Sequence, residues 1–132
     1  MRRQSAWFFT FGLLCALGAG ATHAESHNLE GAALEKAVAG KIVYMSDSAG
    51  TVPIHYKADK TMSGKLQMVT AVLAVTAPKR DQGKWWVQGD RLCQRWNRWL
   101  DAKTHCYKLK RDGNNVLWER NDGRKGKARV GK

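Results

Sequence analysis

The chain has 132 residues, and its 23 Lys and Arg against 11 Asp and Glu give a formal net charge of +12 at pH 7. This length excludes a large multidomain protein and allows one domain with a modest core. The charge favours anionic partners such as lipid head groups, acidic polysaccharide or nucleic acid, although a basic charge also simply keeps an exported protein soluble.

The first 24 residues have the three parts of a secretory signal peptide. Two arginines in MRRQSAW precede the apolar run FFTFGLLCALGAGA, and the small residues Thr22 and Ala24 occupy the positions that a signal peptidase reads. The run is too short to span a bilayer comfortably, which argues against a retained membrane anchor. We therefore predict cleavage after Ala24 and a periplasmic or secreted location. The mature chain, residues 25–132, then has a net charge of +10 without Arg2 and Arg3, and no later run predicts a transmembrane segment.

A single short helix is predicted at the start of the mature domain. Asn28 suits the N-cap of a helix in LEGAALEKAVAG, and Gly40 is placed to end it. The apolar face of this helix, residues 29–39, carries mostly small side chains. A helix of this kind is marginal alone, so we expect it to dock against the rest of the domain.

From Lys41 onward the pattern changes to short β-like runs separated by turn residues. The turns include ADKTMSG, PKRDQG and the Asp-Gly pairs at 112–113 and 122–123, which tolerate the positive φ of tight hairpins. About eight runs predict a mainly β fold for residues 25–132, a single domain in which an antiparallel meander forms a small barrel or a strongly curled sheet. The runs are KIVYMS, VPIHYK, KLQMVTAVLAVTA, WWVQ, RLCQRW, HCYKLK, VLWER and KARV.

Cys93 and Cys106 are the cysteines that remain after cleavage, and in an oxidising compartment an isolated pair indicates one disulfide. If the two lie opposite each other in a hairpin, Leu92 faces Tyr107 and Trp96 shares their face. The other face is then polar and basic, as a half-buried hairpin requires. That second face consists of Arg91, Cys93 and Arg95 beside Thr104, Cys106 and Lys108.

The order GKWWVQGDRLC, then HCY, then two Asp-Gly pairs resembles a group of small exported alphaproteobacterial proteins of unknown function. In that group a helix leads into a meander with a tryptophan strand, a Gly/Asp corner, a Leu-Cys pair and a second cysteine before an Asp-Gly turn. The similarity covers residues 29–131 and includes LEKAVAGKIV and YKADKTMSG, where Lys60 replaces a turn glycine. The resemblance implies a compact exported β domain and brings no catalytic residue, ligand or reaction.

No pattern in the mature chain indicates catalysis. His27, His55 and His105 form no H-x-x-x-H motif or His/carboxylate cluster, and no serine lies in a G-x-S-x-G elbow. The acids, Asp81 among them, are spread about one per turn instead of forming a paired-carboxylate site. We therefore predict no catalytic residue, no metal site, no cofactor and no enzyme activity.

Basic side chains are the strongest functional signal in the sequence. They gather on the two strands of the cysteine hairpin and in the loop between them, where they would attract polyanions in a salt-dependent way. Our anion-binding candidates are Arg91, Arg95, Arg98 and Lys108.

Tryptophans are interleaved with these cations, and such rings can stack on sugars or bases. Trp85, Trp96 and Trp118 are predicted to fill the core of a small barrel. Trp86 points opposite to Trp85 along a strand, and Trp99 lies in a loop. These two are our candidates for exposed aromatic contacts.

The sequence leaves several binding roles open. We favour an exported, non-enzymatic accessory domain that contacts an anionic envelope polymer or lipid head group through its basic face. The alternative is a protein–protein module, such as an inhibitor of an envelope hydrolase, that presents the loop 97–104 to a partner. A small-molecule carrier needs a cavity, which a tryptophan-rich interior argues against, and export argues against a nucleic-acid substrate.

Overall fold

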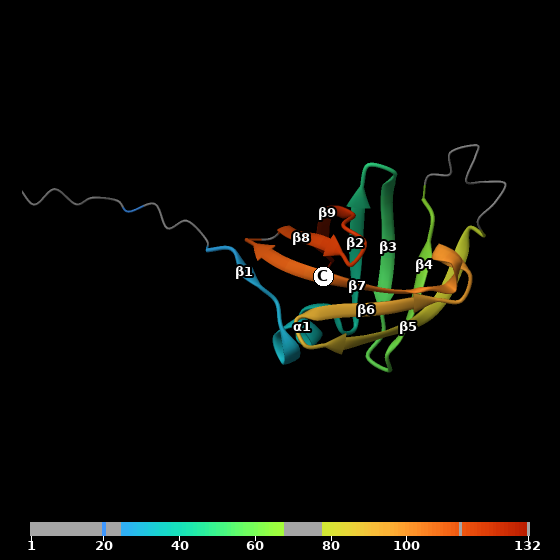
Figure 1. Cartoon of the computed structure of the whole chain (residues 1–132), viewed down its shortest axis with the longest axis horizontal. Helices are drawn as coiled ribbons and strands as arrows, with labels where there is room; N and C mark the ends of the chain where they lie inside the picture. The colour runs from blue at the N-terminus through green and yellow to red at the C-terminus, as the bar shows by residue number, and fades with distance from the viewer. Residues whose placement is uncertain (1–19, 21–24, 68–77, 114, 132) are drawn as a thin grey trace, which may run out of the picture.

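The structure is a computed structural model that describes Gly20 and residues 25–67, 78–113 and 115–131. The predicted signal peptide, residues 1–24, lies outside the described residues, Gly20 excepted. The described chain is mainly β, with one α-helix and nine strands, eight of which form an antiparallel barrel (Figure 1). The predicted fold class is confirmed, and the chain adopts the closed form instead of an open curled sheet.

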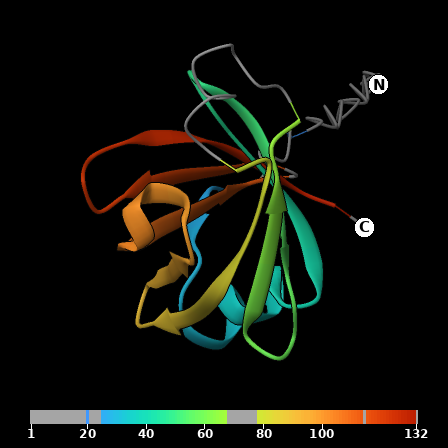
Figure 2. The same ribbon diagram turned by 90° about the vertical axis from the view of Figure 1, so that its right-hand side faces the viewer.

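The barrel strands follow the order β7-β6-β5-β4-β3-β2-β9-β8, and the pairing of β7 with β8 closes the ring around a common interior (Figure 2). Closure gives each strand a neighbour on both sides, which protects its backbone hydrogen-bonding groups. The strands are β2 (Lys41–Asp47), β3 (Gly50–Tyr56), β4 (Thr61–Lys65), β5 (Arg80–Gln88), β6 (Arg91–Trp96), β7 (Thr104–Asp112), β8 (Asn115–Arg120) and β9 (Lys125–Val130).

The segment before the barrel covers one of its ends. β1 (His27–Asn28) pairs with β7 at Arg111, beyond the stretch of β7 that pairs with β6. Helix α1 (Gly31–Val38) follows and lies beside the turn between β5 and β6 (Figure 1), with Leu34 and Val38 buried against the barrel interior. The helix therefore gains its stability by docking, as its weak apolar face predicted.

The predicted helix is confirmed, but it begins later than expected. Asn28 belongs to β1, where its backbone pairs with Lys110, so the N-cap residue is Glu30 and not Asn28. Leu29 is buried and its N–H donates a 2.9 Å hydrogen bond to the carbonyl oxygen of Leu109, which ties this residue to β7, so the helix begins only at Gly31. At eight residues α1 falls well short of a bilayer's thickness, and the described residues contain no other helix that reaches it.

Strand β4 differs from the prediction, in which ADKTMSG (58–64) is a turn and KLQMVTAVLAVTA (65–77) is a strand. The strand begins at Thr61, and residues 68–77 lie outside the described part of the chain. Met62 and Gly64 face the interior, so the alternation is real but carries too little hydrophobicity to be recognised. At Gly64 a Cβ atom would lie 2.6 Å from the Trp99 ring, so only glycine allows this packing.

Large rings fill the barrel. Trp85, Trp96 and Trp118 are all buried, as predicted, and Trp85 meets the Tyr56 ring edge-on with 5.8 Å between centroids. Such edge-to-face pairs add to the stability that burial of the rings provides. The cavity that remains inside is only about 10 Å³, which is the space that a single water molecule needs. The described interior therefore offers no room for a small-molecule cargo.

A polar network crosses this interior. The side-chain oxygen of Gln94 accepts a hydrogen bond of 2.7 Å from the Tyr56 hydroxyl, and its amide nitrogen lies 3.4 Å from the Tyr107 hydroxyl. Burial raises the pKa of the Tyr56 hydroxyl well above its usual range, so this group remains a neutral donor. Gln94 is thus buried with its partners satisfied, and the network fixes the register of three strands from within.

Candidate functional site

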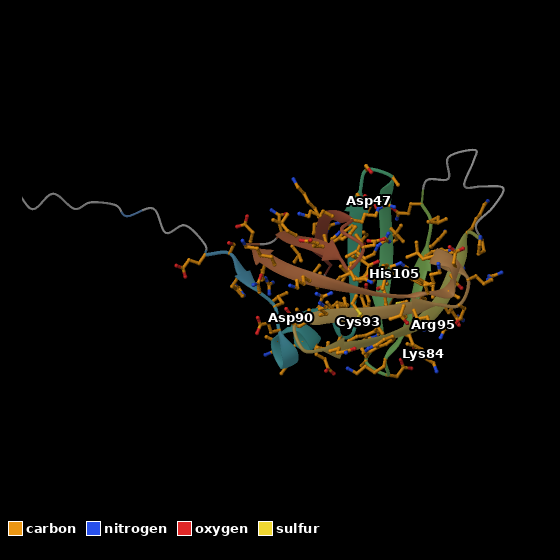
Figure 3. All side chains as sticks on the ribbon, in the orientation of Figure 1. Asp47, Lys84, Asp90, Cys93, Arg95 and His105 are labelled. Carbon is orange, nitrogen blue, oxygen red and sulfur yellow. A yellow bond between two sulfur atoms is a disulfide. The ribbon has the colours of Figure 1, made fainter. Side chains whose placement is uncertain are left out.

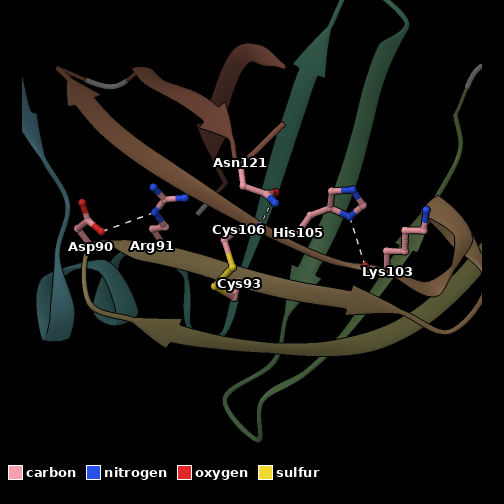
Figure 4. The surroundings of a disulfide bond; sticks show 7 residues. All are labelled: Asp90, Arg91, Cys93, Lys103, His105, Cys106 and Asn121. Carbon is pink, nitrogen blue, oxygen red and sulfur yellow. Dashed lines mark hydrogen bonds and ion pairs between the residues drawn. A yellow bond between two sulfur atoms is a disulfide. The ribbon is translucent and has the colours of Figure 1, made fainter. Parts of the chain in front are cut away.

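The hairpin of β6 and β7 has the predicted register. Cys93 and Cys106 are directly opposite and joined by a disulfide (Figure 4). In the same register Leu92 faces Tyr107. The side-chain oxygen of Asn121 accepts a 3.2 Å hydrogen bond from the Cys106 N–H. Cys93 is only 1% exposed although it lies on the outer face. This shielding indicates a structural cross-link between the two strands and argues against a reactive disulfide.

Trp86 lies on the outer face of β5 directly opposite Cys93. It is half-buried, in contrast to its fully buried neighbour Trp85. The prediction that the two rings point to opposite faces is therefore confirmed. The exposed part of the Trp86 ring lies on a strand that also carries Lys84 on its outer face, so it remains available for contact beside a cation.

Trp99 is not the free ring that the sequence predicted. It is half-buried and packs against Trp96 with 4.6 Å between ring centroids. Its indole N–H donates a 2.7 Å hydrogen bond to the carbonyl oxygen of Pro78. Trp99 therefore anchors the loop after β6, because the barrel end leaves a site above Gly64 into which the ring fits.

Three of the four anion-binding candidates already have a carboxylate nearby, and Arg91 and Lys108 share the same one. Arg91 and Lys108 are cross-strand neighbours, and each has a side-chain nitrogen 3.9 Å from an oxygen of Asp90. Asp90 lies in the turn between β5 and β6, well away from Arg95 (Figure 3). Asp90 therefore partly neutralises the Arg91–Lys108 pair, which lowers its attraction for an external anion.

Arg98 lies beside a buried acid that the sequence analysis assigned to a turn. Asp81 belongs to β5, points inward and is buried at the barrel end, and its Oδ2 accepts 2.8 Å hydrogen bonds from the backbone N–H groups of Arg98 and Trp99. The Arg98 side chain is 67% exposed, and its Nε lies 3.9 Å from Asp81 Oδ1. Asp81 thus fixes the backbone of the loop, and the exposed guanidinium of Arg98 also donates a 3.4 Å hydrogen bond to the carbonyl oxygen of Arg80.

The most unusual feature of the outer surface is a set of like-charged pairs. Lys84 lies directly opposite Arg95, and Lys65 lies directly opposite Arg80. All four are exposed, and none has a carboxylate within 4 Å among the described residues. Like charges in directly opposed positions destabilise a sheet. We name these four residues, together with Arg98 beside Arg80, the cationic strip, which consists of Lys65, Arg80, Lys84, Arg95 and Arg98.

Sequence reasoning identified Arg95 and Arg98 but missed Lys65, Arg80 and Lys84. Lys84 lies in the run before the paired tryptophans, and its outward position follows from the burial of Trp85. That signal was available in the sequence. The opposition of Lys65 and Arg80 was not, because it depends on the pairing of β4 with β5 across a long connection.

An open groove runs along the outer face of β2 to β5 and ends at the cationic strip. Its floor carries polar side chains that can donate or accept hydrogen bonds, and one end carries three cations of the strip. The residues that line it are Ile42, Pro53, His55, Ser63, Gly64, Lys65, Arg80, Asp81, Gln82, Asn97 and Arg98.

The described residues hold no group of three His, Cys, Asp or Glu side chains placed to bind a metal ion. The Nδ1 atom of His105 lies 3.3 Å from the Lys103 carbonyl oxygen. In the described part of the chain His105 forms no ion pair with a carboxylate. The absence of metal, cofactor and catalytic activity stays a prediction from the sequence. This surface supports binding chemistry, because it combines four cations that have no carboxylate within 4 Å among the described residues with a polar groove and an adjacent ring.

No protein family, curated protein or solved structure matches this chain. The resemblance to small exported proteins of unknown function therefore stays a prediction, and the proposals below depend on the geometry of the chain itself.

Proposed function

We propose that this protein is an exported, non-enzymatic binding domain whose cationic strip holds the anionic groups of a cell-envelope component, either a polymer or a lipid head group. The observation that carries the proposal is the direct cross-strand opposition of like charges, Lys84 with Arg95 and Lys65 with Arg80. A phosphate, sulfate or carboxylate between the members of each pair replaces repulsion by two attractions.

The position of Arg95 supports this role. Its Nε donates a 2.7 Å hydrogen bond to the carbonyl oxygen of Ala102, which fixes the direction of the side chain. The terminal nitrogens of the guanidinium stay free to make paired hydrogen bonds to an oxyanion. Because the side chain is already ordered, less conformational entropy is lost on binding.

The spacing of the strip supports an extended ligand. Arg80 and Lys84 are on the same face of β5, four residues apart, which places the two pairs about 13 Å from each other along the strand. Ser63, Gln82 and Asn97 lie along the groove and offer hydrogen bonds to hydroxyl groups. A sugar-containing ligand with negative groups at intervals satisfies both the cations and the polar floor.

Export is part of the same proposal. The signal-peptide pattern of residues 1–24 supports delivery out of the cytoplasm. The Cys93–Cys106 disulfide is compatible with an oxidising compartment such as the periplasm. An envelope ligand is then available to the domain, whereas cytoplasmic nucleic acid is not.

The test compares three double variants that each remove two positive charges. Lys84→Gln with Arg95→Gln and Lys65→Gln with Arg80→Gln affect the strip, and Arg91→Gln with Lys108→Gln is the matched control, since that pair already has Asp90. Each is measured for retention on heparin, and for binding to lipopolysaccharide and to phosphatidylglycerol vesicles, with phosphatidylcholine vesicles as the neutral reference.

Both strip variants are expected to elute from heparin at clearly lower salt than the wild type, while the control elutes close to it. Loss of vesicle binding alone identifies a lipid head group, and loss of polysaccharide binding alone identifies a polymer. Equal losses in all three variants mean that only total charge matters, and that result contradicts the proposal.

A further inference from the structure

The turn after β6 contains three successive residues in the left-handed region of the backbone map. Leu100, Asp101 and Ala102 have φ values of 53°, 57° and 53°. None is glycine, and each therefore has a Cβ that crowds the following carbonyl oxygen. Left-handed residues without glycine are uncommon even singly, and three in a row persist only where the surrounding structure holds them.

Three contacts hold this turn. The carboxylate of Asp81 accepts hydrogen bonds from the two backbone N–H groups that enter it, and the ring of Trp99 is fixed against Trp96. On the exit side, Arg95 donates to the carbonyl oxygen of Ala102. These contacts restrain the turn at its start and at its end, and the side chains that make them come from β5 and β6.

The side chain of Leu100 gains less burial from this arrangement than a core residue does. Leu100 is 40% exposed, so its burial does not offset the strain of its backbone. Two other large apolar side chains, Ile42 and Leu117, are equally exposed among the described residues, at 40% and 41%. Both lie in strands, where a large branched side chain is ordinary on the outer face. In the described part of the chain, Leu100 is the only large exposed apolar residue that also carries a backbone penalty.

We propose that the turn Trp99–Ala102 is a protein-recognition loop that inserts Leu100 into an apolar pocket of a second protein whose rim is acidic. The charge of the rim follows from the exposed cations Arg98 and Lys103 on either side of the turn, which outnumber the one carboxylate beside the anchor, that of Asp101. A rigid loop that presents one apolar anchor matches a preformed pocket, because little entropy is lost on docking. This role goes beyond the binding of envelope anions, because its anchor, Leu100, lies outside the cationic strip, although Arg98 of the strip adjoins the turn.

A bilayer is a poorer match for the same turn. A fluid surface does not reward a fixed backbone, and the exposed carboxylate of Asp101 lies next to the only apolar side chain at the apex. Burial of one leucine is also small beside what stable membrane attachment requires. Membrane insertion is therefore the outcome that the experiment has to separate from protein binding.

The first step places a photo-crosslinking amino acid at position 100 of the full chain, in the cells that export it, and at position 117 as the matched control. The expected result is a discrete crosslinked protein at position 100 that is absent at position 117. That protein is then purified, and its Kd is measured for the wild type, Leu100→Asn, Leu100→Gly and Leu117→Asn.

Asparagine and glycine both tolerate the left-handed region, so the two Leu100 variants are expected to fold, which their melting temperatures check. We expect each to weaken the Kd about tenfold or more, and Leu117→Asn to leave it unchanged. An unchanged Kd for either Leu100 variant, or the same crosslink at both positions or at neither, overturns the proposal. So does a loss of phosphatidylglycerol vesicle binding in Leu100→Asn, which identifies a membrane contact. Vesicle and heparin binding through the cationic strip is otherwise expected to persist, so the two proposals fail separately.

Discussion

Two corners of the barrel contain non-glycine residues at positive φ, and they differ in what the strained side chain does. At the turn between β3 and β4, Lys60 has a φ of 70°, and its ammonium lies 4.2 Å from the centre of the Trp85 ring and pairs with Glu35 of α1. In the turn Trp99–Ala102, the strained Leu100 is 40% exposed, and contacts from neighbouring residues hold the backbone.

The difference separates backbone strain that stabilises the fold from backbone strain that holds a side chain in an exposed position. Lys60 links the helix to a core tryptophan, so its own contacts offset the cost of its backbone. Leu100 makes no comparable contact. Hydrogen bonds and ring packing of the neighbouring residues offset the strain of the turn instead. Backbone strain is therefore informative about function only when the strained side chain is also left free.

The largest expected effect comes from removal of the Cys93–Cys106 disulfide. The loop that this disulfide closes contains Leu100 but not Lys60. Replacing both Cys93 and Cys106 with Ala should lower the free energy of unfolding by about 3 kcal/mol in the chain-entropy model, since the cysteines are 13 residues apart. Urea unfolding measures the loss, with reduced wild-type protein as the control.

Hydrogen exchange of the same double variant sharpens the comparison. The Lys103 N–H donates a hydrogen bond to the carbonyl oxygen of Leu100 in the hairpin loop, and the Lys60 N–H donates one to the carbonyl oxygen of Lys57. The Lys103 amide should lose more protection from exchange than the Lys60 amide. Equal losses at the two amides would show that both corners depend on global stability alone.

A smaller effect is expected at Lys60 itself. Lys60→Ala keeps the positive φ but removes the contacts with Trp85 and Glu35, and should destabilise by about 1–2 kcal/mol. Lys60→Gly loses the same contacts but relieves the backbone, so it should cost about 1 kcal/mol less than Lys60→Ala. Thermal unfolding of the two variants gives the difference, and indistinguishable values would mean that the corner is not strained.

The smallest effect has the opposite sign. Leu100→Gly removes an exposed side chain and relieves one left-handed residue, so it should stabilise the protein by about 1 kcal/mol or less after the higher entropy of the unfolded chain is included. Chemical denaturation measures this change against Leu117→Gly, which sits in a strand and should destabilise. A clear loss of stability in Leu100→Gly would show that the side chain does support the fold.

Much of the β6–β7 hairpin was predictable because its information is local. The register of Cys93 with Cys106 follows from period-two alternation over two strands that are close in sequence. The Asp-Gly pairs predicted tight turns, and Gly113 and Gly123 have φ values of 60° and 89°, in the region those turns require. The core tryptophans followed from the same alternation.

The candidate site was predictable only in part. Arg95 and Arg98 were identified from the clustering of cations along the chain, and Arg91 and Lys108 were identified with them although Asp90 lies beside both. The strip depends on which cations meet across strands, and Lys65 meets Arg80 through a pairing that no local pattern encodes.

Asp81 and Trp99 show the same limit. Aspartate is common in turns, so its position after Pro78 favoured a turn, yet the barrel end buries this carboxylate beneath two backbone N–H groups. Trp99 follows a polar loop sequence, yet Gly64 of a distant strand provides the surface on which its ring packs.

The amino-acid sequence by itself determined the strand alternation, the turn positions, the cysteine pairing and the basic charge, because each depends on neighbours within a few residues or on composition alone. Closure of the barrel decided which cations oppose each other across strands. It also decided which carboxylates are buried in hydrogen bonds to the backbone, and which turn has a strained backbone. These properties arise from contacts between strands far apart in the chain, and such contacts exist only once the last strand pairs with its distant neighbour.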